Sequence, residues 1–152
     1  MAIPFQDQLP KLEGLVLLGG RLLLAWLFAN EAFALATSFD AAAASMAKMG
    51  VPPPVLIATI ALQATAGLAI ALGCGARSGA AALGLFCLAT AVLFHANFHN
   101  RNELLHFEKD LAIAGGMFIL MVHGAGVWSL DRLIEIRPLS RWRERAGLRA
   151  RA

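Results

Sequence analysis

Charged residues are scarce in this chain, and so are cysteines. Asp, Glu, Lys and Arg make up 15% of the 152 residues, whereas 59% are hydrophobic and the mean hydropathy is +0.66. This composition is far too apolar for a soluble domain of this length. The two cysteines, Cys74 and Cys87, lie thirteen positions apart and form no C-x-x-C motif. A thiol–disulfide enzyme is therefore disfavoured, and no structural disulfide is implied.

Common soluble-enzyme motifs are also missing. The sequence contains no P-loop, no glycine fingerprint for a dinucleotide and no nucleophile elbow. The alternation of apolar and polar residues that is typical of strands is absent too. The chain has no room for a separate catalytic domain, so any chemistry must take place within the membrane or come from a partner.

Four long apolar segments fill most of the chain, at residues 15–35, 55–72, 79–94 and 111–128. A transmembrane helix needs about 20 mostly apolar residues, and the third segment reaches that length only by continuing through His95 to Phe98. Backbone groups in hydrocarbon must bond within their own element, so we expect α-helices. The sequence therefore predicts an all-α, integral membrane four-helix bundle.

The connection between the first two spans has a helical pattern of its own. Apolar residues recur at helical spacing from Phe39 to Met49, and Gly50 and Pro52 then end the pattern. We expect a short interfacial helix here. The other connections are a glycine-rich turn at 73–78 and a polar, charged loop at 100–110.

The basic residues indicate which way the helices point. Ten Lys and Arg residues lie on the face that would hold both termini, against three on the opposite face. By the positive-inside rule, both termini are expected in the cytoplasm. Arg21 is expected to anchor the cytoplasmic end of the first span by snorkelling. The ten are Lys11, Arg21, Arg77, Arg132, Arg137, Arg141, Arg143, Arg145, Arg149 and Arg151, and the three are Lys48, Arg101 and Lys109.

The chain divides into a transmembrane domain at 1–131 and an Arg-rich tail at 132–152. A basic tail directly after a span is expected to lie against anionic lipid headgroups, and a short surface helix at 138–148 would suit that contact. Docking to a protein is the alternative. We expect no nucleic-acid partner, because neither stacking aromatics nor a suitable fold accompanies the arginines.

Glu31 is the most informative single residue, because it lies inside the first span. A carboxylate at the centre of a membrane helix costs about 2.5–3.5 kcal/mol, so such residues usually face a site. The alternative is a structural role, as an ion pair or as a protonated carboxyl bonded to a neighbouring helix.

His95 and His99 are four residues apart at the end of the third span, so they are expected to share one helical face. They are weak candidates for metal ligands, because two ligands make no metal site. A proton relay or a quinone headgroup site suits them better, since imidazole titrates near neutral pH. The alternative is that they are merely interfacial. His106 and Asp110 are expected at the same depth, with Asp110 at the N-terminus of the fourth span, where the helix dipole favours a carboxylate.

Several motifs resemble those of the DoxX family of small bacterial membrane proteins. The first part of the resemblance is Arg21-Leu-Leu-Leu, then Leu27-Phe28, then Ser45-Met-Ala-Lys-Met-Gly-Val-Pro52. The second part is His106-Phe-Glu-Lys109-Asp110-Leu-Ala-Ile-Ala-Gly-Gly116, ending near Ser129-Leu-Asp131. Together these motifs cover about residues 15–131 in order.

The resemblance implies a four-helix bundle in the bacterial inner membrane and an association with quinone-linked oxidoreductases. It carries a role only to His106, Lys109 and Asp110, where the family often has Asn at the position of Asp110. The Lys that the family often has late in the first span is absent, and the matching stretch is Glu31-Ala-Phe-Ala-Leu-Ala36.

The first hypothesis is a membrane subunit of a quinone-linked redox complex. Glu31, His95, His99, His106 and Asp110 would form its quinone or proton site near the periplasmic face, and a partner would carry the electron-transferring cofactor. The second hypothesis is a non-enzymatic anchor or assembly factor that docks partner subunits or forms a homo-oligomer. The third is a metal-handling membrane protein.

Overall fold

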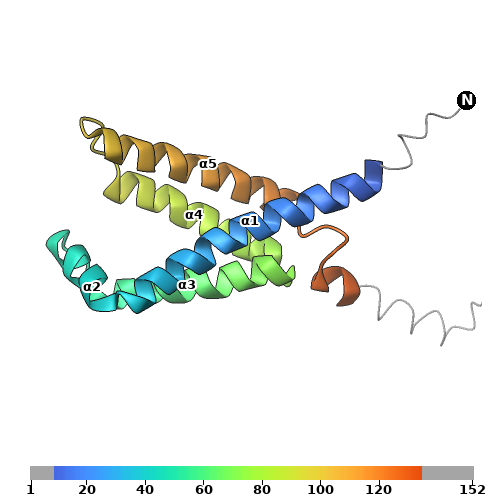
Figure 1. Ribbon diagram of the computed structural model, residues 1–152, viewed down its shortest axis with the longest axis horizontal. Helices are drawn as coiled ribbons and strands as arrows, with labels where there is room; N and C mark the ends of the chain where they lie inside the picture. The colour runs from blue at the N-terminus through green and yellow to red at the C-terminus, as the bar shows by residue number, and fades with distance from the viewer. Residues whose placement is uncertain (1–8, 135–152) are drawn as a thin grey trace, which may run out of the picture.

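The computed structural model describes residues 9–134, and every regular element within that range is helical. The helices are α1 (Leu9–Thr37), α2 (Phe39–Lys48), α3 (Pro53–Leu72), α4 (Ala76–Phe94) and α5 (Arg101–His123). α1 packs against α3, α3 against α4 and α4 against α5 (Figure 1). The predicted all-α class is confirmed for these residues. The predicted surface helix at 138–148 lies outside them, as does most of the Arg-rich tail.

Three of these helices are long and apolar enough to cross a membrane, namely α1 from Leu12, α3 and α4. The fourth predicted span differs from the structure. α5 has 23 residues, and every 18-residue stretch of it contains the charged run Glu108, Lys109 and Asp110. The segment predicted as a span at 111–128 also leaves the helix after His123. Only the central and C-terminal parts of α5 are therefore apolar.

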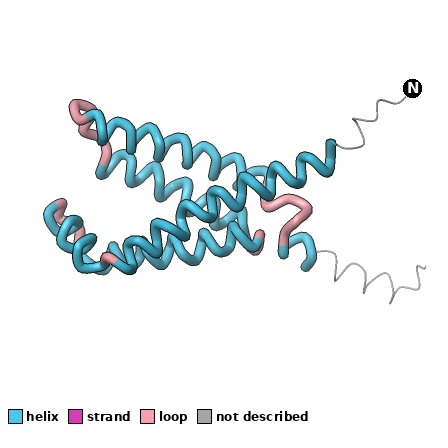
Figure 2. The backbone as a smooth tube through the Cα atoms, in the orientation of Figure 1, coloured by secondary structure: helices cyan, strands magenta, loops and turns pink. Residues whose placement is uncertain are grey.

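The predicted short helix between the first two spans is present as α2, and Gly50 follows it with a positive φ of 76°. Figure 2 shows that the other connections are also short and lie at the helix ends. The predicted extension of the third span through Phe98 is wrong, because α4 ends at Phe94. α4 gains its length at the other end, where it begins at Ala76, directly after the turn at Gly73 and Gly75.

The predicted loop at 100–110 is also wrong, since all but its first residue belong to α5. Asn100 is the N-cap, and its side-chain oxygen accepts a hydrogen bond from the Asn102 N–H at 3.0 Å. Glu103 stands in the first turn, where a carboxylate favours the helix dipole. The charges that indicated a loop are therefore carried on a capped helix.

Small residues let the long helices approach closely. A Cβ added to Gly84 of α4 would lie 2.9 Å from a ring carbon of Phe118 on α5, and one added to Gly79 would lie 3.1 Å from the Ala66 carbonyl of α3. Lipid is as apolar as leucine, so such close packing is a main source of helix association in membranes. The buried core combines small residues with large apolar side chains and consists of Ala25, Phe28, Ala66, Ile70, Ala80, Leu83, Cys87, Ala114, Met117 and Leu120.

Arg21 does not snorkel, which corrects the expectation from sequence. Its side chain is only 3% exposed and reaches the loop that follows α5. Nη1 donates to the Ala125 carbonyl at 2.7 Å, and Nη2 donates to the Trp128 carbonyl at 2.8 Å. Arg21 thus joins the first half of α1 to the loop after α5.

The turn between α3 and α4 is bonded to Asp131, which lies in the short helical segment that follows this loop. The Asp131 N–H donates to the Gly73 carbonyl at 2.9 Å. The Gly75 N–H donates to both carboxylate oxygens of Asp131, each at 3.0 Å. At the opposite end of the molecule, the α1–α3 pair and the α4–α5 pair diverge (Figure 1).

This geometry predicts that Gly73→Ala destabilises the fold much more than Gly75→Ala. Both glycines have a positive φ, of 67° and 65°, so both variants carry a strain of roughly 1–2 kcal/mol. Only at Gly73 would the new Cβ meet neighbours, at 2.5 Å from Ser129 Cβ and 2.6 Å from Arg21 Nη1, whereas at Gly75 nothing lies within 4 Å. The extra loss is expected to be about 1–3 kcal/mol. Thermal unfolding in detergent, followed by circular dichroism, measures it, and equal midpoints for the two variants would contradict the packing described.

Candidate functional site

Polar side chains gather where α4 ends and α5 begins, at the end of the molecule where the two helix pairs diverge. We call this group the α4–α5 polar cluster. Four of its residues were singled out from the sequence, either as site candidates or through the family resemblance, and two are neighbours that contact them. Its members are Thr90, His95, Glu103, His106, Lys109 and Asp110.

His95 is held by the first turn of α5. It is the C-cap of α4, and its Nδ1 lies 2.7 Å from Oε2 of Glu103. A carboxylate only accepts hydrogen bonds, so Nδ1 carries a proton and donates. Both side chains are between a quarter and a third exposed. The second ring nitrogen of His95, Nε2, has no protein partner among residues 9–134.

His106 stacks on His95, with the ring centroids 5.1 Å apart and the planes 26° from parallel. Its Nδ1 lies 3.2 Å from Nζ of Lys109. An ammonium group only donates, so Nδ1 of His106 accepts, and Nε2 carries the proton of the neutral ring. The stacked pair therefore presents one ring nitrogen that accepts and one that donates.

Asp110 lies deeper along α5 and contacts α4. Its Oδ2 accepts a hydrogen bond from Oγ1 of Thr90 at 3.1 Å. The expectation that Asp110 stands at a helix N-terminus is wrong, because α5 begins at Arg101 and Asp110 is in its third turn. Asp110 joins the third turn of α5 to Thr90 near the end of α4, while Glu103 joins the first turn of α5 to His95.

His99 and Glu31 are not brought to the cluster. His99 lies in the turn between α4 and α5, so the expectation that it shares a helical face with His95 is wrong. Both His99 and Glu31 are exposed, and neither forms a hydrogen bond or ion pair within the described part of the chain. Glu31 lies on α1, whose end towards α2 is well separated from α4 and α5 in Figure 1.

Metal ligation receives no support from the side-chain geometry. Over residues 9–134, no three His, Cys, Asp or Glu side chains converge as a metal site requires. Cys74 is exposed and Cys87 is buried, and both are free thiols.

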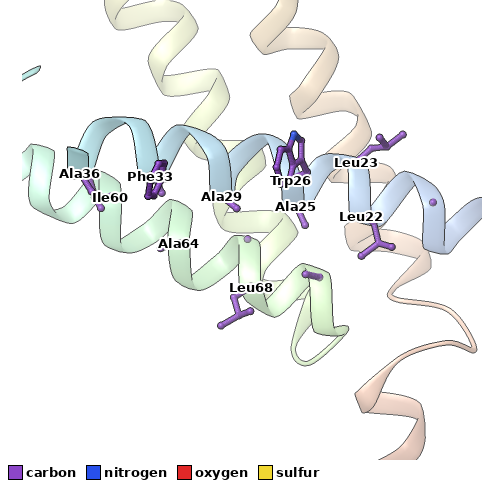
Figure 3. Close-up of a pocket in the computed structure, with 14 residues that line it drawn as sticks. Leu22, Leu23, Ala25, Trp26, Ala29, Phe33, Ala36, Ile60, Ala64 and Leu68 are labelled. Carbon is purple, nitrogen blue, oxygen red and sulfur yellow. The ribbon is translucent and has the colours of Figure 1, made fainter. Parts of the chain in front are cut away.

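A separate apolar groove runs along α1 and α3, with a volume of about 960 Å³. Figure 3 shows Trp26, Phe33 and Leu68 beside it, with Ala29 and Ala64 lining its middle. All of its lining residues have apolar side chains and come from α1 and α3. The groove therefore does not include the α4–α5 polar cluster.

Sequence reasoning missed two partners in the cluster, Glu103 and Thr90. The spacing of Asn100 and Glu103 matches a capping box, which would have placed Glu103 on a helix beside His95. It also missed Gln63 of α3, which is 6% exposed and whose Oε1 has no hydrogen-bond partner within residues 9–134. A glutamine inside an apolar span was the available signal for that buried polar group.

The chain is similar to a known protein family and to two bacterial membrane proteins. The DoxX family model matches residues 16–96. The inner membrane protein YqjF of Escherichia coli K12 is 38% identical over 124 residues, which cover 82% of this chain and 95% of YqjF. The inner membrane protein YphA of the same organism is 32% identical over 124 residues, covering 77% of this chain and 89% of YphA. No solved structure matches the chain.

The family match ends before α5 begins. It includes Thr90 and His95 but not Glu103, His106, Lys109 or Asp110. The chemistry of the cluster therefore has to be argued from its contacts.

The Thr90–Asp110 contact predicts a difference between two matched variants. Thr90→Val removes the hydroxyl that bonds Asp110 across the two helices, so stability is expected to fall by about 0.6–1.7 kcal/mol, the range measured for such bonds in membranes. Thr65→Val is the control, because the exposed Thr65 hydroxyl bonds only its own helix, at the Ala61 carbonyl. Unfolding in detergent by sodium dodecyl sulfate titration measures both. An equal loss in the two variants would show that the interhelical bond contributes nothing.

Proposed function

This chain is a small membrane protein of the DoxX family, and we propose that it is an inner-membrane subunit of a quinone-linked redox complex. In this proposal it anchors the complex and exchanges protons with a quinone through the α4–α5 polar cluster. The electron-carrying cofactor belongs to a partner subunit.

The proposed orientation has four membrane-crossing helices and both termini in the cytoplasm. It is supported by the excess of Lys and Arg on one face and by the two relatives, which are inner membrane proteins of a bacterium. In this orientation the α4–α5 polar cluster lies at the periplasmic side. The turn between α3 and α4 then lies at the cytoplasmic side.

The observation that carries the proton site is the His95–Glu103 pair stacked on His106. Reduction of a quinone to a quinol takes two electrons and two protons, so a site needs groups that hydrogen-bond the carbonyl oxygens and exchange protons. Nε2–H of His106 is a donor for a quinone carbonyl. Nε2 of His95 is an acceptor for a quinol hydroxyl. When His95 takes the proton it becomes an imidazolium, which the Glu103 carboxylate stabilises.

The other predicted site residues are not part of the pair that would exchange protons. Asp110 acts on the α4–α5 contact through Thr90. Glu31 and His99 stay predictions, because they have no contact with the pair that would exchange protons.

Glu103→Gln tests the proposal. The substitution replaces the charge-assisted bond to His95 with a neutral one, and losing about 1.5–3 kcal/mol reduces quinone retention about tenfold or more. Glu108→Gln is the matched control, because Glu108 is an exposed residue of the same helix with no hydrogen bond or ion pair within residues 9–134. The measurement is the quinone content per protein after gentle extraction from native membranes, by solvent extraction and chromatography.

Two results would contradict the proton and quinone site. One is a wild-type protein that retains no quinone, and the other is equal quinone retention in Glu103→Gln and Glu108→Gln. Either result would favour the second candidate function, a non-enzymatic anchor.

The observation that favours an anchor is the apolar groove on α1 and α3. Its lining reaches from Gly19 to Ala36 on α1, a length of about 25 Å at 1.5 Å per residue, which is close to the thickness of a bilayer core. The occupant would be an apolar transmembrane helix of a partner subunit. In that case partner polypeptides co-purify with the Glu103→Gln variant as well as with the wild type.

A further inference from the structure

A second polar cavity lies at the end of the molecule opposite the α4–α5 polar cluster. It has a volume of about 500 Å³ and is lined by the start of α4, the end of α5 and residues between 124 and 134. The proposed redox function makes no use of it. The residues that matter for its chemistry are Arg77, Gly126, Ser129, Asp131 and Arg132.

Arg77 provides a positive charge at the mouth of the cavity. Its side chain lies against Gly124, where an added Cβ would be 3.0 Å from Nε of Arg77. Arg77 is exposed and forms no hydrogen bond or ion pair within residues 9–134. A guanidinium has five N–H donors in a planar fork that matches two oxygens of a phosphate. All five donors of Arg77 therefore remain available to a ligand.

The loop supplies backbone donors beside Arg77. The carbonyls of Ala125 and Trp128 turn inward to accept from Arg21. In a trans peptide the N–H points opposite to the carbonyl, so the N–H groups of Gly126 and Ser129 turn away from Arg21. Both of these residues line the cavity, and neither N–H donates to a protein group within the described residues.

The charge balance of the lining favours an anion. Arg77 and Arg132 are basic, and Asp131 is the single acidic member. The Asp131 carboxylate is already occupied by the Gly75 N–H, which donates to both of its oxygens. Unpaired backbone N–H groups in a loop beside a guanidinium are the usual elements of an anion site.

An apolar rim beside the cavity favours an anion that is attached to a lipid. Val127 and Ile134 belong to the lining of the cavity and are 61% and 59% exposed. α3 ends and α4 begins at this level, and both are long and apolar enough to span a membrane, so the cavity lies at the depth of lipid headgroups. A phospholipid can place its phosphate in the cavity and its acyl chains along the rim.

We propose that this cavity binds the phosphate of an anionic phospholipid headgroup, with Arg77 and the Gly126 and Ser129 amides as the donors. Arg132, the first residue of the Arg-rich tail, lines the cavity, but the proposed donors Arg77, Gly126 and Ser129 all precede the tail. The site does not depend on the proposed redox function.

Native mass spectrometry of the full-length protein tests the site with dioleoyl phosphatidylglycerol as the probe. Arg77→Gln is expected to weaken binding of the first lipid about tenfold or more, because a charge-assisted bond to phosphate is lost. Arg101→Gln is the matched control, an exposed arginine at the opposite end without a hydrogen bond or ion pair within residues 9–134. The thermal unfolding midpoint of Arg77→Gln is expected to match that of the wild type, since Arg77 has no hydrogen-bond or ion-pair partner within residues 9–134.

Two further probes identify what is recognised. Dioleoylglycerol, which lacks the phosphate, is expected not to bind, whereas retention equal to phosphatidylglycerol would overturn the proposal. Inorganic phosphate is the second probe. If it binds as tightly as the lipid and its binding depends on Arg77, the result supports recognition of phosphate, with a soluble phosphate as the ligand in place of the lipid. Phosphatidylglycerol that binds Arg77→Gln as tightly as wild type would overturn the proposal, because the tail or the rim would then account for the binding.

Discussion

The burial of one guanidinium organises this molecule. Arg21 lies within the first membrane-capable helix, at a place where its charge needs acceptors and lipid offers none. It finds them in two carbonyls of the loop after α5, and hydrogen bonds to a charged group stabilise by roughly 1.5–3 kcal/mol each. Asp131, just after this loop, bonds the α3–α4 turn. The first half of α1 is thereby joined to the neighbouring ends of α3, α4 and α5, and the two helix pairs diverge at the opposite end of the molecule (Figure 1).

The two ends of the molecule carry different kinds of polar groups. At the diverging end, imidazole and carboxylate groups contact one another between α4 and α5, and these are the groups of the proposed proton site. At the fastened end, Arg21 turns two loop carbonyls inward, and the same peptide groups turn their N–H donors away from it. The two peptide groups that accept hydrogen bonds from Arg21 therefore also provide the N–H donors of the proposed phosphate site. The apolar groove on α1 and α3 belongs to neither end, which is why a quinone ring and a partner helix would use different surfaces.

Much of the fold could be predicted from the apolar runs, because backbone groups in lipid must form helices. α1, α3 and α4 lie where those runs lie, and the glycine and proline after Met49 correctly end α2. The start of α5 could not be predicted from hydropathy, because its first turns are charged and their helix is set by the Asn100 cap. Because the start of α5 was predicted wrongly, the expected positions of His99 and Asp110 were wrong too. For the same reason Glu103, which bonds His95, was not predicted as part of the site. Arg21 was misread for another reason, since its acceptors lie more than 100 residues away in the sequence.

In the proposed function the His95–Glu103 pair exchanges protons with a quinone, and redox-difference infrared spectroscopy of the purified, quinone-loaded protein detects that exchange. Reduction of the bound quinone is expected to change imidazole ring bands together with a carboxylate band, and Glu103→Gln is expected to remove the carboxylate change. A difference spectrum that contains only the bands of the quinone itself would contradict proton exchange by this pair.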